Sequence, residues 1–530
     1  MDSCPRANPW FVHHAKVRKG RGGQQSETRG AGIAPPVIGQ PAILLPMDFK
    51  LWRPDGDARY TNFAWTLPGE WPGEISVQNG RIVESTGGPT IDLGGANLIP
   101  AFIDAHCHIL PTGLDLQKLH LGQCSTHDEV LDAVRERHLE LPEGAWLMAV
   151  HYDQTKYNGV HLHRDQLDAI STDRPILLRH VNGHASVANS ATLQAAKVTD
   201  ATPDPKGGTY VKDSGGRLTG VLLERAHEFV TATAPSPTTE EMVDAILAAG
   251  EAMASYGVTC ATDMMTGRYD LARELEAYRL AAERGCAIRT RLCIQWAELF
   301  GPRAKPVDDL IAALDGERCR VWGAKIFADG AIGSATAAVY EPYVSEGGTG
   351  QLIYAPEKLK QMVRTAHEKG WRIAIHAIGD RATDLVMDAY EALDEPARHR
   401  IEHAMILSDA QIERMLKLGI HCTMQPEFLA RFGHSYRHHL GPERASKLKR
   451  FRSVKDAGIP LSFNSDRPIV AGDPWLACAS ASNRPEGYVQ EENLTYAEAL
   501  EAYTMMGAVA NNDPAPLSMG QPAEFITWAG

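Results

Sequence analysis

Residues 101–108, AFIDAHCH, are the stretch on which the interpretation of this sequence depends. An apolar run of this kind predicts a buried strand, and side chains alternate across a strand, so His106 and His108 are expected to point to the same side. Two imidazoles at this spacing can bind one metal ion. The pair alone is a weak signal, because two nearby histidines among the 21 in the chain can also be incidental.

Three later apolar runs also end in residues that bind metals. They are IAIHAIGD at 373–380, RIEHA at 400–404 and LSFNSDRP at 461–468, and they contribute His376, His403 and Asp466. Each has an ordinary alternative: a hydrogen-bonded core position for the histidines and a helix N-cap for the aspartate. Four such strand ends in one chain nevertheless favour a metal site.

The order of apolar runs and helical patterns predicts the fold class. Between residues 99 and 470 the two alternate, as in RVWGAKIFA (320–328) followed by APEKLKQMVRTAHEKG (355–370). This alternation predicts an α/β fold with parallel strands, either a doubly wound sheet or a (β/α)8 TIM-type barrel. The barrel is favoured because it gathers the carboxyl ends of its strands, and hence the polar residues, into one mouth. The stretch 110–255 is long for one connection and predicts an insertion.

The other segments define the expected domain boundaries. Residues 1–46 are basic and then rich in glycine and proline, which predicts a disordered extension or an unused upstream start, with a nucleic-acid or targeting tail as the alternative. Residues 47–98 carry short strand-like pieces with Asn-Gly and Gly-Gly turn signals. Residues 99–470 are assigned to the barrel, and residues 471–530 to a C-terminal helical segment with a final strand.

The composition argues against several classes of protein. A net charge of −13 disfavours a general nucleic-acid binder, since phosphate contacts need clustered lysine and arginine. The nine cysteines form no CxxC pair, so we expect reduced core residues in a cytoplasmic protein rather than a disulfide framework or a zinc ribbon. No apolar run approaches the roughly 20 residues of a membrane-spanning helix.

Lys325 lies in an apolar strand-like run, VWGAKIFADGAIGS at 321–334. An ammonium group in the dry interior of a barrel needs a partner or a lowered pKa. A lysine carbamate, formed with CO2, would be an anionic oxygen ligand that can bridge two metal ions. An ion pair with Asp329 is the alternative, and the residues alone do not decide between the two.

Taken together, these motifs resemble the metal-dependent amidohydrolases, and specifically amidohydrolase family 3 with its N-substituted formamide deformylase-like enzymes, from about residue 75 to about 526. The resemblance rests on PAFIDAHCH (100–108), KIFADGAIGS (325–334), HAIGDRA (376–382), RIEHA and NSDRP (464–468), with weaker matches at 183–193, 219–226 and 424–428. The chain departs from this branch at Ala335, where arginine is frequent, and at Asn464, where glycine is usual. The first departure suggests a different substrate.

The resemblance implies a hydrolase that cleaves a non-peptide carbon–nitrogen bond, of amide or formamide type, with a metal-activated hydroxide. It implies two divalent ions, zinc before other metals, or one ion, held by His106, His108, Lys325 as a carboxylated lysine, His376, His403 and Asp466. Asp466 would also carry the proton, and His184 would donate to the developing oxyanion. The expected substrate-binding residues are His180, Asn182, Glu224, Asp329 and Gln425.

The resemblance also implies a small β-sandwich formed from both chain ends and is compatible with a homodimer. The expected partner is a small-molecule substrate, with no nucleic acid and no membrane. Two alternatives stay open. The same site could hydrolyse a lactone, a carbamate or a phosphate ester, or the chain could be a non-catalytic member that binds a small molecule.

Overall fold

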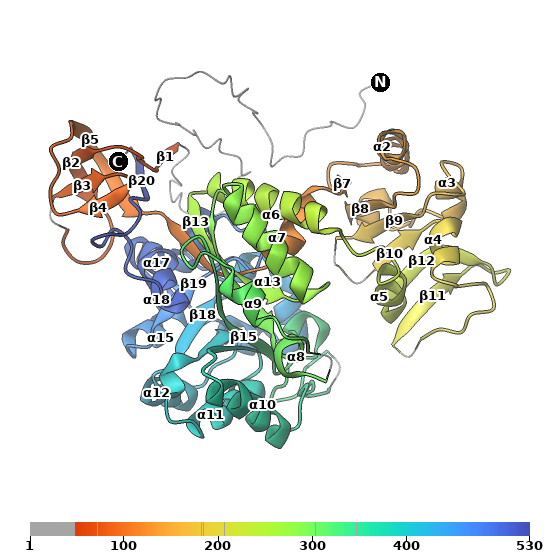
Figure 1. Ribbon diagram of the computed structural model, residues 1–530. Coiled ribbons are helices and arrows are strands. Elements are labelled where there is room, and N and C mark those ends of the chain that lie inside the picture. The colour runs from red at the N-terminus through yellow and green to blue at the C-terminus, as the bar shows by residue number, and fades with distance from the viewer. Residues whose placement is uncertain are drawn as a thin grey trace. The chain divides into compact units, whose positions relative to one another are not determined.

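An eight-stranded parallel sheet curls into a nearly closed barrel in a computed structural model that describes residues 48–529 except 72, 182, 184, 206, 303 and 346 (Figure 1). Its strands follow the order of the chain: β6 (Phe102–Cys107), β13 (Val258–Thr266), β14 (Arg289–Gln295), β15 (Cys319–Phe327), β16 (Ile373–Ala377), β17 (Arg400–His403), β18 (His421–Met424) and β19 (Leu461–Phe463). Two backbone hydrogen bonds of 2.8 Å bring the end of β19 back to β6, from Asp466 N to His106 O and from His108 N to Arg467 O. The predicted (β/α)8-type barrel is confirmed.

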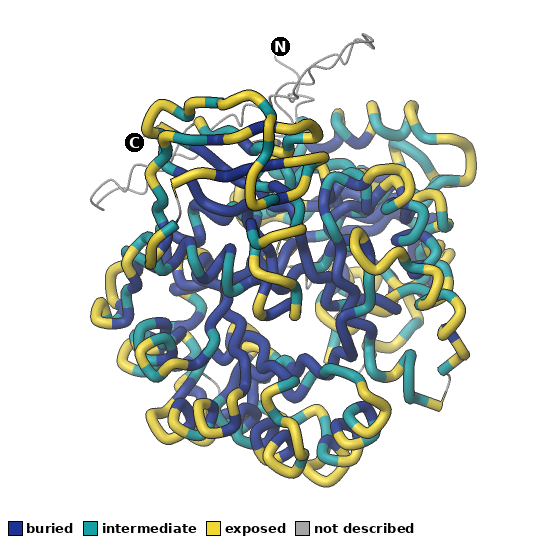
Figure 2. Tube along the Cα trace, turned by 60° about the vertical axis from the view of Figure 1, so that its left-hand side comes forward, coloured by how far each residue is buried: buried dark blue, intermediate teal, exposed yellow. Residues whose placement is uncertain are grey.

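Helices connect the barrel strands and leave those strands buried, whereas the outer turns of the helices are exposed (Figure 2). The longer ones are α1 (Ile109–Leu116), α6 (Thr239–Ala254), α7 (Leu271–Glu283), α10 (Pro356–Glu368), α11 (Asp380–Glu391), α12 (Asp409–Leu418), α13 (Glu427–Leu440), α16 (Pro474–Ser482) and α17 (Tyr496–Tyr503). The shorter ones are α8 (Trp296–Phe300), α9 (Asp308–Ala312), α14 (Pro442–Ser446), α15 (Phe451–Asp456) and α18 (Met505–Asn511). Burial on both faces explains why strands such as β16, IAIHA, are mostly apolar.

Both ends of the described chain contribute to one small mixed sheet, in the order β1-β20-β5-β2-β3-β4. The strands are β1 (Phe49–Trp52), β2 (Ala58–Trp65), β3 (Glu74–Gln78), β4 (Arg81–Val83), β5 (Thr90–Pro100) and β20 (Phe525–Trp528). The Asn79-Gly80 turn between β3 and β4 has positive φ at both residues, 49° and 74°, as a two-residue hairpin turn requires. The expectation of a small β-sandwich from both chain ends is confirmed in its strands, which form one six-stranded mixed sheet.

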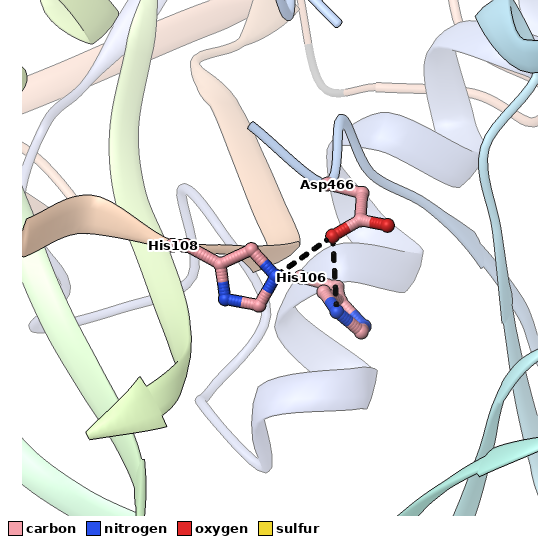
Figure 3. Close-up of side chains that lie close together, drawn as sticks. All are labelled: His106, His108 and Asp466. Atoms are coloured by element: carbon pink, nitrogen blue, oxygen red, sulfur yellow. Dashed lines mark ion pairs between the residues drawn. The ribbon is translucent and has the colours of Figure 1, made fainter. Parts of the chain in front are cut away.

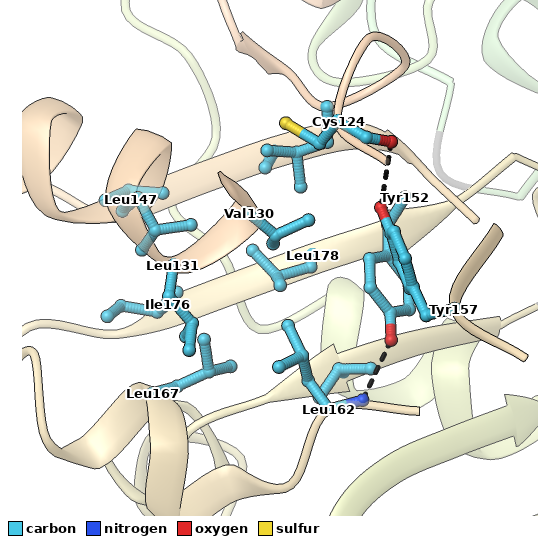
Figure 4. Close-up of a cluster of buried hydrophobic side chains, with 14 of the residues drawn as sticks. Cys124, Val130, Leu131, Leu147, Tyr152, Tyr157, Leu162, Leu167, Ile176 and Leu178 are labelled. Carbon is cyan, nitrogen blue, oxygen red and sulfur yellow. Dashed lines mark hydrogen bonds between the residues drawn. The ribbon is translucent and has the colours of Figure 1, made fainter. Parts of the chain in front are cut away.

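Residues 113–241 form a separate compact unit with its own sheet, in the order β11-β12-β10-β9-β8-β7. Its elements are β7 (Leu119–His120), β8 (Leu147–Tyr152), β9 (Ile176–His180), β10 (Ala185–Ala188), β11 (Gly208–Lys212), β12 (Leu218–Glu224), α2 (His127–Glu140), α3 (Arg164–Asp168), α4 (Ser190–Ala195) and α5 (Arg225–Thr231). Leucine, isoleucine and tyrosine side chains between the sheet and its helices form a core (Figure 4). The apolar run at 174–181, which resembles a barrel strand in sequence, belongs to this sheet.

Some expectations fall on parts of the chain that the structure covers only in part. The predicted extension at residues 1–46 lies outside the described residues. The eight cysteines within the described range are buried. Among the described residues, no helix has the length and apolarity that crossing a membrane would need.

Two buried histidines of the barrel predict an acid-sensitive fold. Burial, with nearby positive charge, lowers the pKa of His399 and His421 to about 3, against about 6.5 in an unfolded chain. Between these values the unfolded state binds protons that the folded state does not. Stability should therefore fall as the pH drops below 6.5, by up to about 1.4 kcal/mol per pH unit for each histidine.

Urea unfolding between pH 7.5 and 5 measures this dependence. The His421→Gln variant, which has no titrating group at this position, should show a shallower loss of unfolding free energy. An identical slope in variant and parent would contradict the assignment.

Candidate metal centre

His106, His108 and Asp466 meet at the carboxyl ends of the first and last barrel strands (Figure 3). Asp466 Oδ1 lies 2.9 Å from His108 Nε2 and 3.4 Å from His106 Nε2. One ligand atom from each residue lies within 4.8 Å of the others. Asp473, not Asp466, caps the next helix, α16. The three residues therefore form a candidate site for one metal ion, and the N-cap alternative for Asp466 does not apply.

A buried carboxylate fixes the ring of His106. His106 Nδ1 lies 2.6 Å from Glu402 Oε2, which also accepts a 2.6 Å hydrogen bond from Thr423 Oγ1. Arg400 Nε lies 2.6 Å from the other oxygen, Oε1. Burial raises the pKa of Glu402, but Arg400 and His106 outweigh it and hold that pKa well below its usual range. Since the ionised Glu402 only accepts, His106 carries its proton on Nδ1, and Nε2 keeps a lone pair.

His376 and His403 form a second pair of imidazoles, with ring centroids 4.5 Å apart. His376 Nε2 lies 2.9 Å from the carbonyl oxygen of Gly330, and His403 Nδ1 lies 3.0 Å from Gln425 Oε1. Each oxygen accepts a hydrogen bond, so the lone pair remains on Nδ1 of His376 and on Nε2 of His403. Burial lowers the pKa of His376 to about 3 and lowers that of His403 well below its usual value, which keeps both rings neutral.

An unusual backbone conformation turns the side chains of His403 and Asp466 toward the site. His403 has φ 76° and Asp466 has φ 56°, both in the left-handed region that non-glycine residues rarely adopt. Regular alternation along β17 would place Glu402 and His403 on opposite faces, yet Glu402 contacts His106 and the His403 ring also lies against the rings of His106 and His376. Non-glycine residues keep such a conformation only where the surrounding structure enforces it, and they concentrate at functional sites.

Lys325 lies among these groups on β15 with only 2% of its surface exposed. Its charge contributes to lowering the pKa of both His106 and His376, and burial lowers the pKa of Lys325 itself. Nζ has no hydrogen-bond partner among the residues that the structure describes. Asp329 does not pair with it, because its carboxylate accepts backbone N–H groups of Ala338, Ile378 and Gly379.

The donor set fits divalent metal ions. Metal ligands must be neutral imidazoles and ionised carboxylates. Burial, together with the Lys325 charge, lowers the pKa of His106 to about 4. Burial opposes the ionisation of Asp466, but the neighbouring histidines and Lys325 outweigh it and lower the Asp466 pKa. The unpaired Nζ of Lys325 is a further buried polar atom that a bound group would satisfy.

The substrate-binding residues expected from the sequence stay predictions. Gln425 and Asp329 lie in the barrel, where Gln425 contacts His403 and Asp329 holds a loop. His180 and Glu224 lie in the 113–241 unit, at the ends of β9 and β12. Asn182 and His184 lie outside the described residues.

The structure also adds residues that the sequence reasoning missed. Glu402 contacts His106, Arg400 contacts Glu402, and Lys449 donates a hydrogen bond to the backbone oxygen of His403. A glutamate and an arginine inside the short buried strand RIEH are a usable signal, because buried charges need partners. Lys449 gives no such signal, since it stands in the basic loop sequence KLKR (447–450).

A parallel barrel with histidines and an aspartate at the carboxyl ends of its strands is typical of metal-dependent hydrolases. The chain belongs to the amidohydrolase family, whose model matches residues 89–529. The predicted membership, in amidohydrolase family 3, is thereby confirmed.

Proteins of similar sequence and a similar solved structure agree with this family membership. A putative amidohydrolase of Bacillus subtilis, YtcJ, is 32% identical over 85% of this chain and 88% of its own length. The N-substituted formamide deformylase of Arthrobacter pascens is 29% identical over 79% of this chain and 80% of its own length. Among solved structures, a metal-dependent hydrolase from Pyrococcus furiosus is 26% identical and superposes with a TM-score of 0.75, covering 89% of this chain and 99% of that one.

Proposed function

We propose that this amidohydrolase-family protein cleaves a non-peptide carbon–nitrogen bond, of amide or formamide type. The observation that carries the proposal is the cluster of His106, His108 and Asp466 at the mouth of the barrel, with ligand atoms within 4.8 Å of one another. The similarity to an N-substituted formamide deformylase supports the choice of bond.

Two divalent ions would be held by this set of residues. His106, His108 and Asp466 would bind one ion and His376 with His403 the other, and Lys325, carboxylated, would bridge them. Imidazole and carboxylate donors suit zinc. Bound metal ions would supply Lewis acidity, which activates water and polarises a carbonyl group.

The side chains of the site have distinct roles in the proposed reaction. Asp466 would take a proton from the attacking water on a carboxylate oxygen and return it to the leaving nitrogen, since an amine leaves poorly unless it is protonated. Glu402 would keep His106 in the Nδ1–H tautomer. The residues proposed for the substrate are His184, which would donate to the developing oxyanion, together with His180, Asn182, Glu224, Asp329 and Gln425.

A substrate panel with matched bond types tests the function. The zinc-reconstituted protein is incubated with N-substituted formamides, secondary amides and cyclic amides, and with lactones, carbamates and phosphate esters of similar size. Products are followed by mass spectrometry, and chelator-treated protein serves as the control. We expect kcat/KM for the formamides and amides to exceed kcat/KM for the other substrates at least tenfold, a difference of about 1.4 kcal/mol in the barrier. Turnover of the formamides and amides should disappear in the chelator-treated protein.

Two outcomes would contradict the proposal in different ways. Preferred turnover of lactones, carbamates or phosphate esters would support the metal site but show that it cleaves a different type of bond. No turnover and no bound metal after reconstitution would instead favour a non-catalytic binding protein.

A further inference from the structure

Lys449 is a fully buried lysine that lies behind one of the proposed metal ligands. It stands between α14 and α15 with 0% of its surface exposed. Its Nζ lies 2.7 Å from Gln425 Oε1 and 3.1 Å from the backbone oxygen of His403. A lysine thus reaches both the main chain of His403 and the side chain that contacts the His403 ring.

The side-chain amide of Gln425 is held in one orientation. Its oxygen faces Lys449 Nζ and His403 Nδ1, and its nitrogen donates a 2.8 Å hydrogen bond to Asn464 Oδ1. A reversed amide would place its NH2 group against the lysine, where donors would face each other, and would leave Asn464 Oδ1 without this donor. Gln425 and Asn464 are themselves buried, so water does not readily replace these bonds.

This fixed orientation determines the tautomer of His403. An amide oxygen accepts hydrogen bonds and cannot donate, so the ring must carry its proton on Nδ1 and its lone pair on Nε2. Lys449 also binds the His403 carbonyl at the residue whose φ of 76° lies in the left-handed region. The same lysine therefore supports both the ring and the unusual backbone of His403.

We propose that Lys449 is a positioning residue, which acts through Gln425 and Asn464 to present His403 Nε2 to a divalent metal ion. The effect on metal binding rests on the proposed two-metal site, but the tautomer of His403 can be measured independently of any metal.

The tautomer is read from long-range 1H–15N spectra of full-length protein labelled at histidine, with His403 assigned by a His403→Asn variant. We expect Nδ1–H in the parent protein, a substantial Nε2–H population in Lys449→Met, and the same shift in Gln425→Met, which leaves Lys449 in place. The conservative Gln425→Glu keeps an acceptor and should retain Nδ1–H. Nε2–H in the parent, or an unchanged tautomer in either methionine variant, overturns the proposal.

Cobalt(II) titration followed by visible absorption tests the consequence. The parent should bind two equivalents, and Lys449→Met should bind the second about 10- to 100-fold more weakly, as loss of an orienting partner typically does. Binding of the first equivalent should not change, because neither Lys449 nor Gln425 hydrogen-bonds to His106, His108 or Asp466.

A matched control separates positioning from general destabilisation. Thr504→Val removes another fully buried donor, whose Oγ1 donates a 2.8 Å hydrogen bond to Leu500 O, and should leave both the tautomer and cobalt binding unchanged. Equal weakening of the second equivalent in this control would overturn the proposal. A parent that binds only one equivalent would contradict the two-metal site instead, and the tautomer measurement would still decide the role of Lys449.

Discussion

Asp466→Asn is expected to lower kcat/KM for the best substrate by about 10²- to 10⁴-fold, the usual contribution of a general acid–base group. Asparagine has nearly the same shape but cannot take up the proton and carries no charge for a metal ion. Asp466 Oδ1 is the atom closest to both imidazoles, at 2.9 Å from His108 and 3.4 Å from His106. Steady-state kinetics with the substrate found in the panel, at saturating zinc, measure the effect.

The same chemical change seven residues later provides the control. Asp473 is partly buried, and its carboxylate caps α16 by accepting the backbone N–H of Trp475. Asparagine caps helices about as well as aspartate, so Asp473→Asn should retain nearly full activity. If Asp466→Asn kept more than a tenth of the parent activity, Asp466 would not be the proton carrier.

Lys325→Met should have opposite effects on function and stability. Metal content is expected to fall from two equivalents to one or fewer, and activity by about 10³-fold, or about 4 kcal/mol in the barrier. The metal-free variant should nevertheless unfold with a free energy about 1 to 3 kcal/mol higher than the metal-free parent. Lys325 Nζ is a buried donor that has no hydrogen-bond partner among the described residues. Methionine fills a similar volume and removes this unsatisfied donor.

Three measurements test the lysine prediction. Elemental mass spectrometry gives the metal content, denaturant unfolding gives the stability, and 13C spectra after growth with labelled bicarbonate report the carbamate directly. Lys447→Met, at an exposed lysine, should change none of them. Unchanged metal content in Lys325→Met would show that Lys325 does not bind metal, and lower stability of its metal-free form would show that its amine has a partner.

Much of the barrel could be predicted from local sequence. Strands such as β16, IAIHA, are buried on both faces and read as apolar runs, and the polar residue at the end of each run marks the mouth. The run at 174–181 shows the limit of this reasoning. It has the same pattern as a barrel strand, yet β9 pairs with β10 in the antiparallel part of another sheet. Pairing partners are set by contacts distant in sequence, which a local pattern does not contain.

The sequence also predicted the residues of the site but not their orientation. The identities of His106, His108, His376, His403 and Asp466 follow from motifs at strand ends, and the structure brings the first two together with Asp466. The orientations of the His106, His376 and His403 rings do not follow from those motifs. They depend on Glu402, Gly330 and Gln425, respectively, which lie on other segments of the chain.

The sequence by itself determined the α/β class, the family and the residue types at the barrel mouth, because these depend on local periodicity and on short motifs. The tertiary structure decided which nitrogen of His106, His376 and His403 keeps its lone pair. It also decided that Asp329 binds backbone groups rather than Lys325, and that Lys449 donates to the backbone oxygen of His403. Those facts are set by hydrogen bonds between residues up to 296 positions apart, formed where burial leaves each donor and acceptor few alternative partners.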